Sequence, residues 1–176
     1  MTTILMVPGL GGSGPEHWQS RWEQSDSRCR RVEQQDWDEP QLEVWRSTLE
    51  QAVRATQGPI VLVAHSLGAV LVAHWAGKGS VDRVSGALLV APPDVESPAR
   101  VPEQIRHFAP IPRERLPFAS VVVASQDDSY ACISCAHTLA DAWGSQLVDV
   151  GRKGHINAES ALGDWEEGKS LLRALM

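Results

Sequence analysis

Short hydrophobic runs alternate with longer amphipathic segments along this chain. Five of the runs are almost continuously apolar and rich in β-branched residues, which is typical of strands buried on both faces of a parallel sheet. They cover residues 3–7, 59–64, 87–91, 120–124 and 146–150. Residues 31–37 form a more polar run, which predicts a sixth strand at an edge of the sheet.

Between these runs, apolar residues recur at three- and four-residue intervals, the spacing that places them on one face of a helix. The clearest series are Leu42, Trp45, Leu49, Ala52 and Val53, then Ile133, Ala136, Leu139, Ala140 and Trp143, and finally Trp165, Leu171, Leu172 and Leu175. This alternation of strand and helix predicts a doubly wound α/β sheet, which binds ligands outside the carboxyl ends of its strands. Candidate chemistry is therefore expected in the loops that follow strands.

Two connections add detail to this alternation. Ser13 and Glu16 have the spacing of a capping box, which predicts a helix that begins after Ser13 and carries Trp18 and Trp22 on one face. Residues 92–117 are rich in proline and charge and show little periodicity. They predict a long connection with one short helix near residues 103–107.

Composition narrows the class of protein. A chain of 176 residues, 43% of them hydrophobic and 22% charged, is typical of one globular domain, expected here over residues 1–176. The net charge of −6, with acidic and basic residues interspersed, argues against a nucleic-acid partner. The first apolar run lacks a cationic leader and is too short to span a bilayer, so no membrane association is expected.

The chain has three cysteines, Cys29, Cys132 and Cys135. They are too few and too unevenly placed for the disulfide framework of a small secreted domain, so a cytoplasmic location is expected. The C-x-x-C pattern at Cys132 and Cys135 could be a redox pair or half of a zinc site. No second cysteine pair or histidine cluster completes a metal shell, so two ordinary cysteines on a helix are favoured and no metal or organic cofactor is expected.

Ser66 has the surroundings of a catalytic nucleophile. It follows the predicted strand 59–64 and precedes a helical pattern, which is the strand–turn–helix arrangement of a nucleophile elbow. Such a turn is so tight that small side chains are needed two positions before and after the serine, and here these are Ala64 and Gly68. The alternative is a serine that only caps the following helix.

A serine hydroxyl becomes a good nucleophile when a histidine accepts its proton and an acid orients that histidine. In α/β-hydrolases these residues occur in the order serine, acid, histidine. Asp128 and His155 each follow a predicted strand and come in that order. Asp128 is favoured as the acid, with Asp127 as its rival and Asp94 behind them, and simple turn formation is an alternative role for the adjacent pair.

Two further histidines lie near these residues in the chain. His65 directly precedes the nucleophile and is expected to point away from the hydroxyl of Ser66. His17 follows the loop after the first strand, so it is expected either to line the site or to pack beside Trp18.

Acyl transfer also requires hydrogen-bond donors for the oxyanion that develops in the transition state. The backbone N–H of Leu67, directly after the nucleophile, is one predicted donor. The second is the N–H of Leu10, in the glycine-rich loop 8–14 after the first strand, because glycines let the backbone come close to a substrate.

The same loop also permits a dinucleotide-binding interpretation, since Gly9-x-Gly11 follows a strand and precedes a helix. Gly12 and Gly14 do not complete the G-x-G-x-x-G spacing, and no anchoring acid is clearly placed further on. The chain also lacks a phosphate-binding loop of the form G-x-x-x-x-G-K-[ST]. No nucleotide is therefore expected.

Taken together, these segments resemble the small single-domain serine hydrolases related to retinoblastoma-binding protein nine. The resemblance runs nearly end to end and is carried by residues 7–14, 16–18, 64–68, 91–94, 125–128 and 154–160. It implies a three-layer α/β/α sandwich with a six-stranded parallel sheet, which is a minimal α/β-hydrolase fold without a large cap domain. It also implies a triad of Ser66, Asp128 and His155. The family's usual proline after the second aspartate is Ser129 here, so the choice between Asp128 and Asp127 stays open.

The expected function is that of an esterase-type serine hydrolase, a carboxylic ester hydrolase in which Ser66 attacks a small ester, thioester or amide. The expected partner is thus a small acyl compound, and the shortness of residues 92–117 predicts an open, shallow site. One alternative is an interaction protein that keeps the hydrolase fold with weak activity, and another is an acyltransferase. The ordered serine, acid and histidine favour an enzyme, whereas no oligomeric state follows from the sequence.

Overall fold

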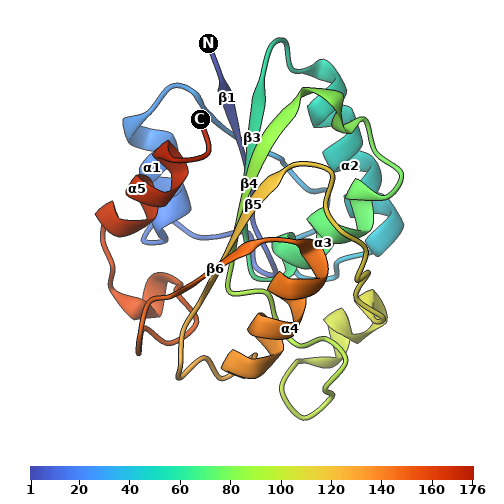
Figure 1. The fold of residues 1–176 in the computed structure, drawn as a ribbon, viewed down its shortest axis with the longest axis vertical. Helices are drawn as coiled ribbons and strands as arrows, with labels where there is room; N and C mark the ends of the chain where they lie inside the picture. The colour runs from blue at the N-terminus through green and yellow to red at the C-terminus, as the bar shows by residue number, and fades with distance from the viewer.

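Six parallel strands form one sheet between two layers of helices in the computed structural model, which describes residues 1–176 (Figure 1). The strands are β1 Thr3–Val7, β2 Cys29–Arg31, β3 Ile60–His65, β4 Val84–Val90, β5 Ala119–Ala124 and β6 Gln146–Asp149. The α-helices are α1 Trp18–Ser25, α2 Leu42–Ala55, α3 Leu67–Ala76, α4 Ile133–Trp143 and α5 Glu166–Arg173. The sheet order is β2-β1-β3-β4-β5-β6. This arrangement confirms the predicted three-layer α/β fold.

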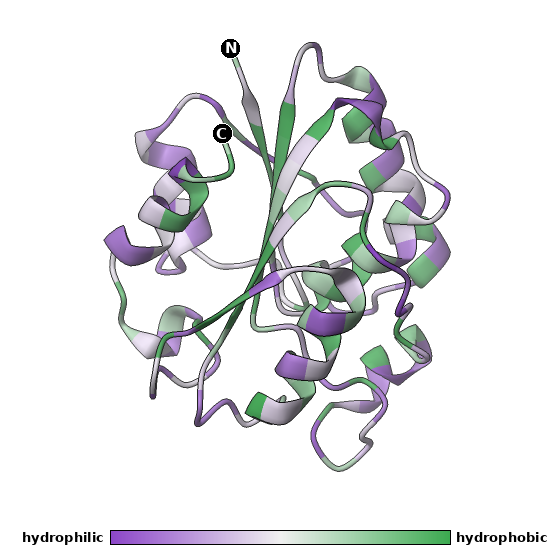
Figure 2. Ribbon diagram, in the orientation of Figure 1, coloured by the Kyte–Doolittle hydropathy of each residue, from purple (hydrophilic) through white to green (hydrophobic).

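The helices divide between the two faces of the sheet. Helices α1 and α5 cover one face, and α2, α3 and α4 cover the other (Figure 1). The hydrophobic cluster beneath α1 and α5 includes Trp18, Trp22 and Trp165, whereas the larger cluster on the opposite face includes Trp45 and Trp143. In Figure 2 the central strands are mostly hydrophobic, whereas the hydrophilic stretches lie mainly in the surrounding helices and loops.

The register of the central strands sets where the loops meet. Val7 of β1 pairs with Ala64 of β3, so these two strands end at the same level of the sheet. The loop after β1 therefore lies beside the turn after β3, and the loops after β5 and β6 reach the same edge. All six residues of β3 are buried, in keeping with its continuous apolar run.

The edge strand β2 is shorter and earlier than predicted. Strand pairing covers only Cys29–Arg31, and one further bond joins the Val32 N–H to the Met6 carbonyl. The prediction of a strand over residues 31–37 is therefore wrong, although its placement at an edge is right. The reason is tertiary, because Trp37 leaves the sheet to pack on Gly12 while its carbonyl accepts the Gly11 N–H at 2.9 Å.

The predicted capping box at Ser13 and Glu16 is also wrong. Helix α1 begins at Trp18, and its N-cap is His17, whose Nδ1 accepts the N–H of Gln19 at 3.1 Å. Ser13 has a positive φ of 55° and donates its hydroxyl to the side chain of Gln19, so the loop takes another turn before the helix starts. The shared face of Trp18 and Trp22 is nevertheless confirmed, since both are buried.

The long connection after β4 contains one short 3₁₀ helix at Glu103–Phe108, close to the predicted position. Ile105 and Phe108 point inward from it and are buried. No helix of the fold combines the length and the apolar character needed to cross a membrane.

Candidate active site

Ser66 occupies a strained turn between β3 and α3. Its φ of 55° and ψ of −125° lie in a region that residues with a side chain rarely adopt. Two backbone bonds hold it there, because its N–H donates to the Val90 carbonyl at 2.8 Å and its carbonyl accepts the Ala69 N–H at 2.9 Å. The Ser66 side chain makes no capping hydrogen bond to α3, which argues against the capping alternative.

Gly68 explains why the elbow needs a small residue after the serine. A Cβ atom at this position would lie 2.1 Å from the Val7 carbonyl oxygen and 2.8 Å from that of Pro8. On the other side of the serine, Ala64 is fully buried and pairs with Val7 and Leu89 in neighbouring strands. The crowding therefore comes from the backbone of β1 and from close packing in the central sheet.

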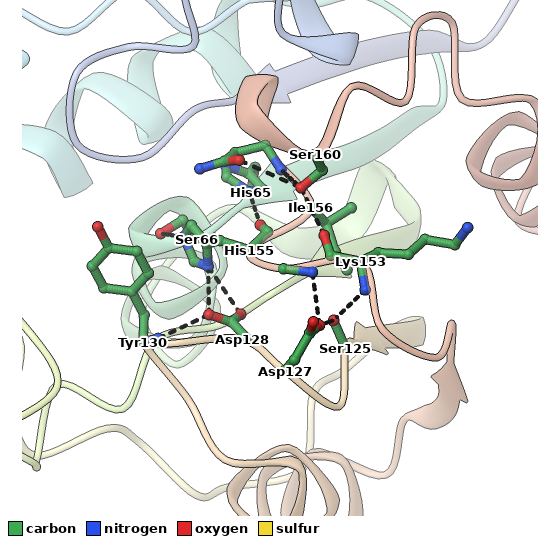
Figure 3. A network of polar contacts seen from close by, with 12 residues as sticks. His65, Ser66, Ser125, Asp127, Asp128, Tyr130, Lys153, His155, Ile156 and Ser160 are labelled. Atoms are coloured by element: carbon green, nitrogen blue, oxygen red, sulfur yellow. Dashed lines mark hydrogen bonds and ion pairs between the residues drawn. The ribbon is translucent and has the colours of Figure 1, made fainter.

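His155 lies between Ser66 and Asp128 (Figure 3). Its Nε2 is 2.8 Å from Ser66 Oγ, and its Nδ1 is 2.9 Å and 3.0 Å from the two carboxylate oxygens of Asp128. A carboxylate only accepts hydrogen bonds, so Nδ1 carries the proton and the lone pair of Nε2 faces the serine hydroxyl. The Asp128 side chain is 3% exposed and that of His155 is 10% exposed, so water screens the pair only weakly.

Of the three candidate acids, only Asp128 contacts the imidazole. Asp127 Oδ1 instead accepts the Gly154 N–H and the Ser125 hydroxyl, each at 2.9 Å. These two hydrogen bonds, that of Gly154 first, lower the pKa of Asp127. Asp94 lies after β4 with a carboxylate oxygen 3.6 Å from the sulfur of Cys135.

The loop that carries His155 is held at several further points. The His65 Nε2–H donates to the backbone carbonyl of His155 at 3.0 Å, and the Trp18 indole N–H donates to the Ile156 carbonyl at 2.8 Å. Ile156 is fully buried with a positive φ of 51°, a conformation that a β-branched residue rarely adopts. His65 thus supports the base through its main chain, which sequence reasoning missed. Its position directly before Ser66 is the only signal that could have indicated this contact.

His17 and His65 are buried as neutral imidazoles. Burial, the nearby Arg31 and His155 lower the pKa of His17 to about 3. Burial, followed by the neighbouring His17 and His155, lowers the pKa of His65 well below its usual value. His17 fulfils both expectations for it, because its ring lines the cavity beside Ser66 and also packs against Trp18 at 5.2 Å between centroids.

The two predicted oxyanion donors come from the start of α3 and from the loop after β1. The Leu67 N–H is the first of α3, so it has no acceptor within the helix. The loop after β1 lies directly against it, since a Cβ at Gly9 would be 2.9 Å from the Leu67 nitrogen. Leu10 lines the same cavity as Ser66, and its N–H donates to no other group of the chain.

A cavity of about 290 Å³ opens next to Ser66 and His155. Leu10 and Tyr130 contribute to its wall, and Glu159 is the only acidic or basic residue of its lining apart from the histidines. The connection after β4 also contributes, through Pro93, Pro102 and Ile105. This short segment thus forms one side of the site without building a separate cap.

The prediction that Cys132 and Cys135 are two ordinary cysteines on a helix is wrong, because they are bonded to each other. Cys132 is the N-cap of α4 and Cys135 lies in its first turn, which brings their Cα atoms to 5.2 Å. This separation is within the range that a disulfide spans, and the two sulfurs are bonded. Helix geometry at the N-cap, which the C-x-x-C spacing alone does not fix, brings them together. No group of three histidine, cysteine or acidic side chains is arranged to hold a metal ion.

Comparison with known proteins adds to this geometry. Residues 4–174 match the family model described as serine hydrolase. A protein described as a YdeN-like hydrolase from Pectobacterium atrosepticum is 32% identical, with 99% of this chain and 90% of that chain covered and a TM-score of 0.88. The ydeN gene product from B. subtilis is 18% identical, with 99% of this chain and 98% of that chain covered and a TM-score of 0.78.

A more distant likeness is to Est1E from Butyrivibrio proteoclasticus, in a structure with ferulic acid bound. It is 12% identical, with 99% of this chain and 89% of that chain covered and a TM-score of 0.73. At this identity the similarity concerns the fold alone. Together with the two YdeN structures, it confirms the predicted α/β-hydrolase fold. No curated protein matches the sequence.

Proposed function

The chain belongs to the serine hydrolase family, and from this premise we propose that it hydrolyses small carboxylic esters through an acyl-enzyme on Ser66. The observation that carries the proposal is the imidazole of His155, which contacts the Ser66 hydroxyl at 2.8 Å and the Asp128 carboxylate at 2.9 Å. This is the geometry that a general base needs in order to activate a serine.

In the proposed first half-reaction, Ser66 Oγ attacks the carbonyl carbon of the substrate and its proton passes to His155 Nε2. Asp128 keeps Nδ1 protonated and stabilises the imidazolium that forms. The N–H groups of Leu67 and Leu10 stabilise the oxyanion. The tetrahedral intermediate then collapses, and His155 gives its proton to the leaving group.

In the second half-reaction, water attacks the acyl-enzyme with His155 again as the base, which restores Ser66.

The cavity of about 290 Å³ favours substrates with short acyl groups, whether they are esters or the related thioesters and amides. We also propose that the chain is related to the small single-domain serine hydrolases of the retinoblastoma-binding protein nine group. The segment 154–160, which carries the base, supports that relation.

The test is labelling with a fluorophosphonate probe, which reacts with activated serines. We expect wild-type protein to be labelled, Ser66→Ala to be unlabelled, and His155→Ala to be labelled on the order of 10³-fold more slowly. Circular dichroism establishes that each variant is folded. Folded wild-type protein that takes up no probe would refute the proposal.

Hydrolysis of p-nitrophenyl butyrate tests the acid. Asp128→Asn is expected to lower kcat on the order of 10³- to 10⁴-fold, because an amide favours the wrong tautomer of His155. The matched variant Asp127→Asn keeps an acceptor for the Gly154 N–H and should stay close to wild type. The reverse ranking of these two variants would mean that Asp127 is the acid.

A further inference from the structure

The loop after Asp128 leads to a second pair of reactive side chains, the Cys132–Cys135 disulfide. Both cysteines are partly exposed at the N-terminus of α4, and the hydrolytic mechanism uses neither of them. We propose that this disulfide is a reversible thiol–disulfide exchange site whose reaction partner is a dithiol. Two bonded cysteines, a helix N-terminus and a neighbouring carboxylate together carry this proposal.

The two sulfurs differ in their surroundings. Cys132 Sγ lies 3.2 Å from the exposed hydroxyl of Ser134 and 3.3 Å from the backbone nitrogen of Cys135, whose N–H points to it. Cys135 Sγ lies 3.6 Å from an oxygen of Asp94. A backbone N–H at a helix N-terminus stabilises a thiolate, whereas a carboxylate disfavours one.

These surroundings assign the order of events. The dithiol, as a thiolate, attacks Cys135 Sγ; the Cys132–Cys135 bond breaks, and its electron pair leaves on Cys132 Sγ, where the Cys135 N–H stabilises the thiolate until it takes up a proton from solvent. The second thiolate of the dithiol then attacks the reagent sulfur bonded to Cys135 and expels Cys135 as a thiolate. The carboxylate of Asp94 disfavours that anion, so Cys135 also takes up a proton from solvent.

The net reaction is balanced. The dithiol loses two electrons and two protons and becomes a disulfide, while Cys132 and Cys135 gain both and become thiols. Oxidation of the protein is the same sequence in reverse, with a small-molecule disulfide as the oxidant.

The exchange site is connected to the proposed triad by one residue, Tyr130. Its N–H donates to Asp128 Oδ1 at 2.9 Å, its carbonyl accepts the Asp94 N–H at 3.0 Å, and its ring lies 4.5 Å from that of His155. Reduction frees the first turn of α4 and loosens these contacts, so we expect kcat for ester hydrolysis to fall about threefold. This consequence rests on the proposed function, whereas the exchange site does not.

The experiment equilibrates the full chain with mixtures of reduced and oxidised dithiothreitol, traps thiols with a maleimide and counts the labels by mass. One transition from zero to two labels is expected, on Cys132 and Cys135. Cys29 is the internal control, because burial raises its pKa to about 12 and it should stay unlabelled in the native protein. Two labels in every mixture, or none in every mixture, would overturn the proposal.

Two further variants sharpen the result. Asp94→Asn removes the carboxylate that disfavours the Cys135 thiolate, so reduction by dithiothreitol should be about threefold faster; an unchanged rate would contradict the assigned order of events. For the coupling, kcat on p-nitrophenyl butyrate is compared between oxidised and reduced protein. The double variant Cys132→Ser, Cys135→Ser is the redox-insensitive control.

The outcomes separate the two proposals. Equal kcat in both forms of the wild type would overturn the connection through Tyr130. Absence of hydrolysis in both forms would contradict the proposed function, while the label count would still decide whether the disulfide exchanges.

Discussion

Ser66 has a strained backbone conformation in the candidate site. Its positive φ persists because hydrogen bonds to neighbouring segments hold both its N–H and its carbonyl. Gly68 completes the turn, since the first helical turn of α3 passes against the backbone of β1 with no room for a Cβ. The nucleophile is thus presented by a conformation that the local sequence permits but that the sheet enforces.

Gly68→Ala should therefore be strongly destabilising. The added methyl group would meet backbone atoms of β1, which cannot move without disturbing the centre of the sheet, so a loss of about 3 kcal/mol is expected. Gly77→Ala is a matched control at the end of the same helix, where a Cβ meets no atom within 4 Å, and it should change stability by less than about 0.5 kcal/mol. Urea unfolding measures both values, and equal midpoints for the two variants would contradict this reasoning.

At the scale of elements, the loop after β6 is attached to the loop after β5. Asp127 accepts the Gly154 N–H, and Ser125 Oγ accepts the Lys153 N–H while donating to Asp127 (Figure 3). The adjacent aspartates thus have separate roles, because one contacts the imidazole of His155 and the other contacts the backbone that carries it.

Asp127→Ala should affect the rate more than substrate binding. It leaves the Gly154 N–H without its acceptor and lets His155 shift, so kcat is expected to fall about tenfold with little change in KM. Asp127→Asn should restore most of the rate, because its amide oxygen can accept the same bond. Steady-state hydrolysis of p-nitrophenyl butyrate gives both constants. A normal kcat in Asp127→Ala would show that this attachment does not position the base.

At the scale of the whole molecule, the layer of α1 and α5 closes over two neutral imidazoles. His17 comes from the start of α1 and His65 from the end of β3, and their rings are 4.6 Å apart. Both have a lowered pKa, chiefly because they are buried. Protonation of either imidazole in the folded state would therefore destabilise the packing of α1 and α5 on the sheet.

Stability should consequently fall as the pH falls below about 6.5, the ordinary pKa of histidine. In that range the unfolded chain binds protons that the folded chain does not, so the free energy of unfolding decreases. With a folded pKa of about 3, His17 alone accounts for a loss of about 2 kcal/mol between pH 7.5 and pH 5, and His65 adds to it in the same direction.

Urea unfolding between pH 7.5 and pH 5 measures this loss. The variant His17→Asn keeps a side chain suited to the N-cap of α1 but removes one buried imidazole, so its stability should depend less on pH. A wild-type midpoint that is constant over this range would contradict the expectation.

The sequence by itself determined the order and type of the elements. A strand buried on both faces needs a continuous apolar run, and a helix buried on one face needs apolar residues at three- and four-residue intervals. These two patterns therefore predicted β1, β3 and the other central strands, and the helices between them. The strand–turn–helix context of Ser66 and the serine, acid, histidine order likewise follow from local chemistry along the chain. These features need no knowledge of what lies across the fold.

The tertiary structure alone decided the features that depend on contacts between distant segments. Three aspartates follow strands, and only the fold brings Asp128 rather than Asp127 or Asp94 to the imidazole. Packing of Trp37 on the loop after β1 ended the edge strand early, and the path of that loop moved the start of α1 to Trp18. The bond of Cys132 to Cys135 likewise depends on where α4 begins. Residue types and spacing identify the groups that can react, whereas distances of a few ångströms between separate loops decide which of them meet.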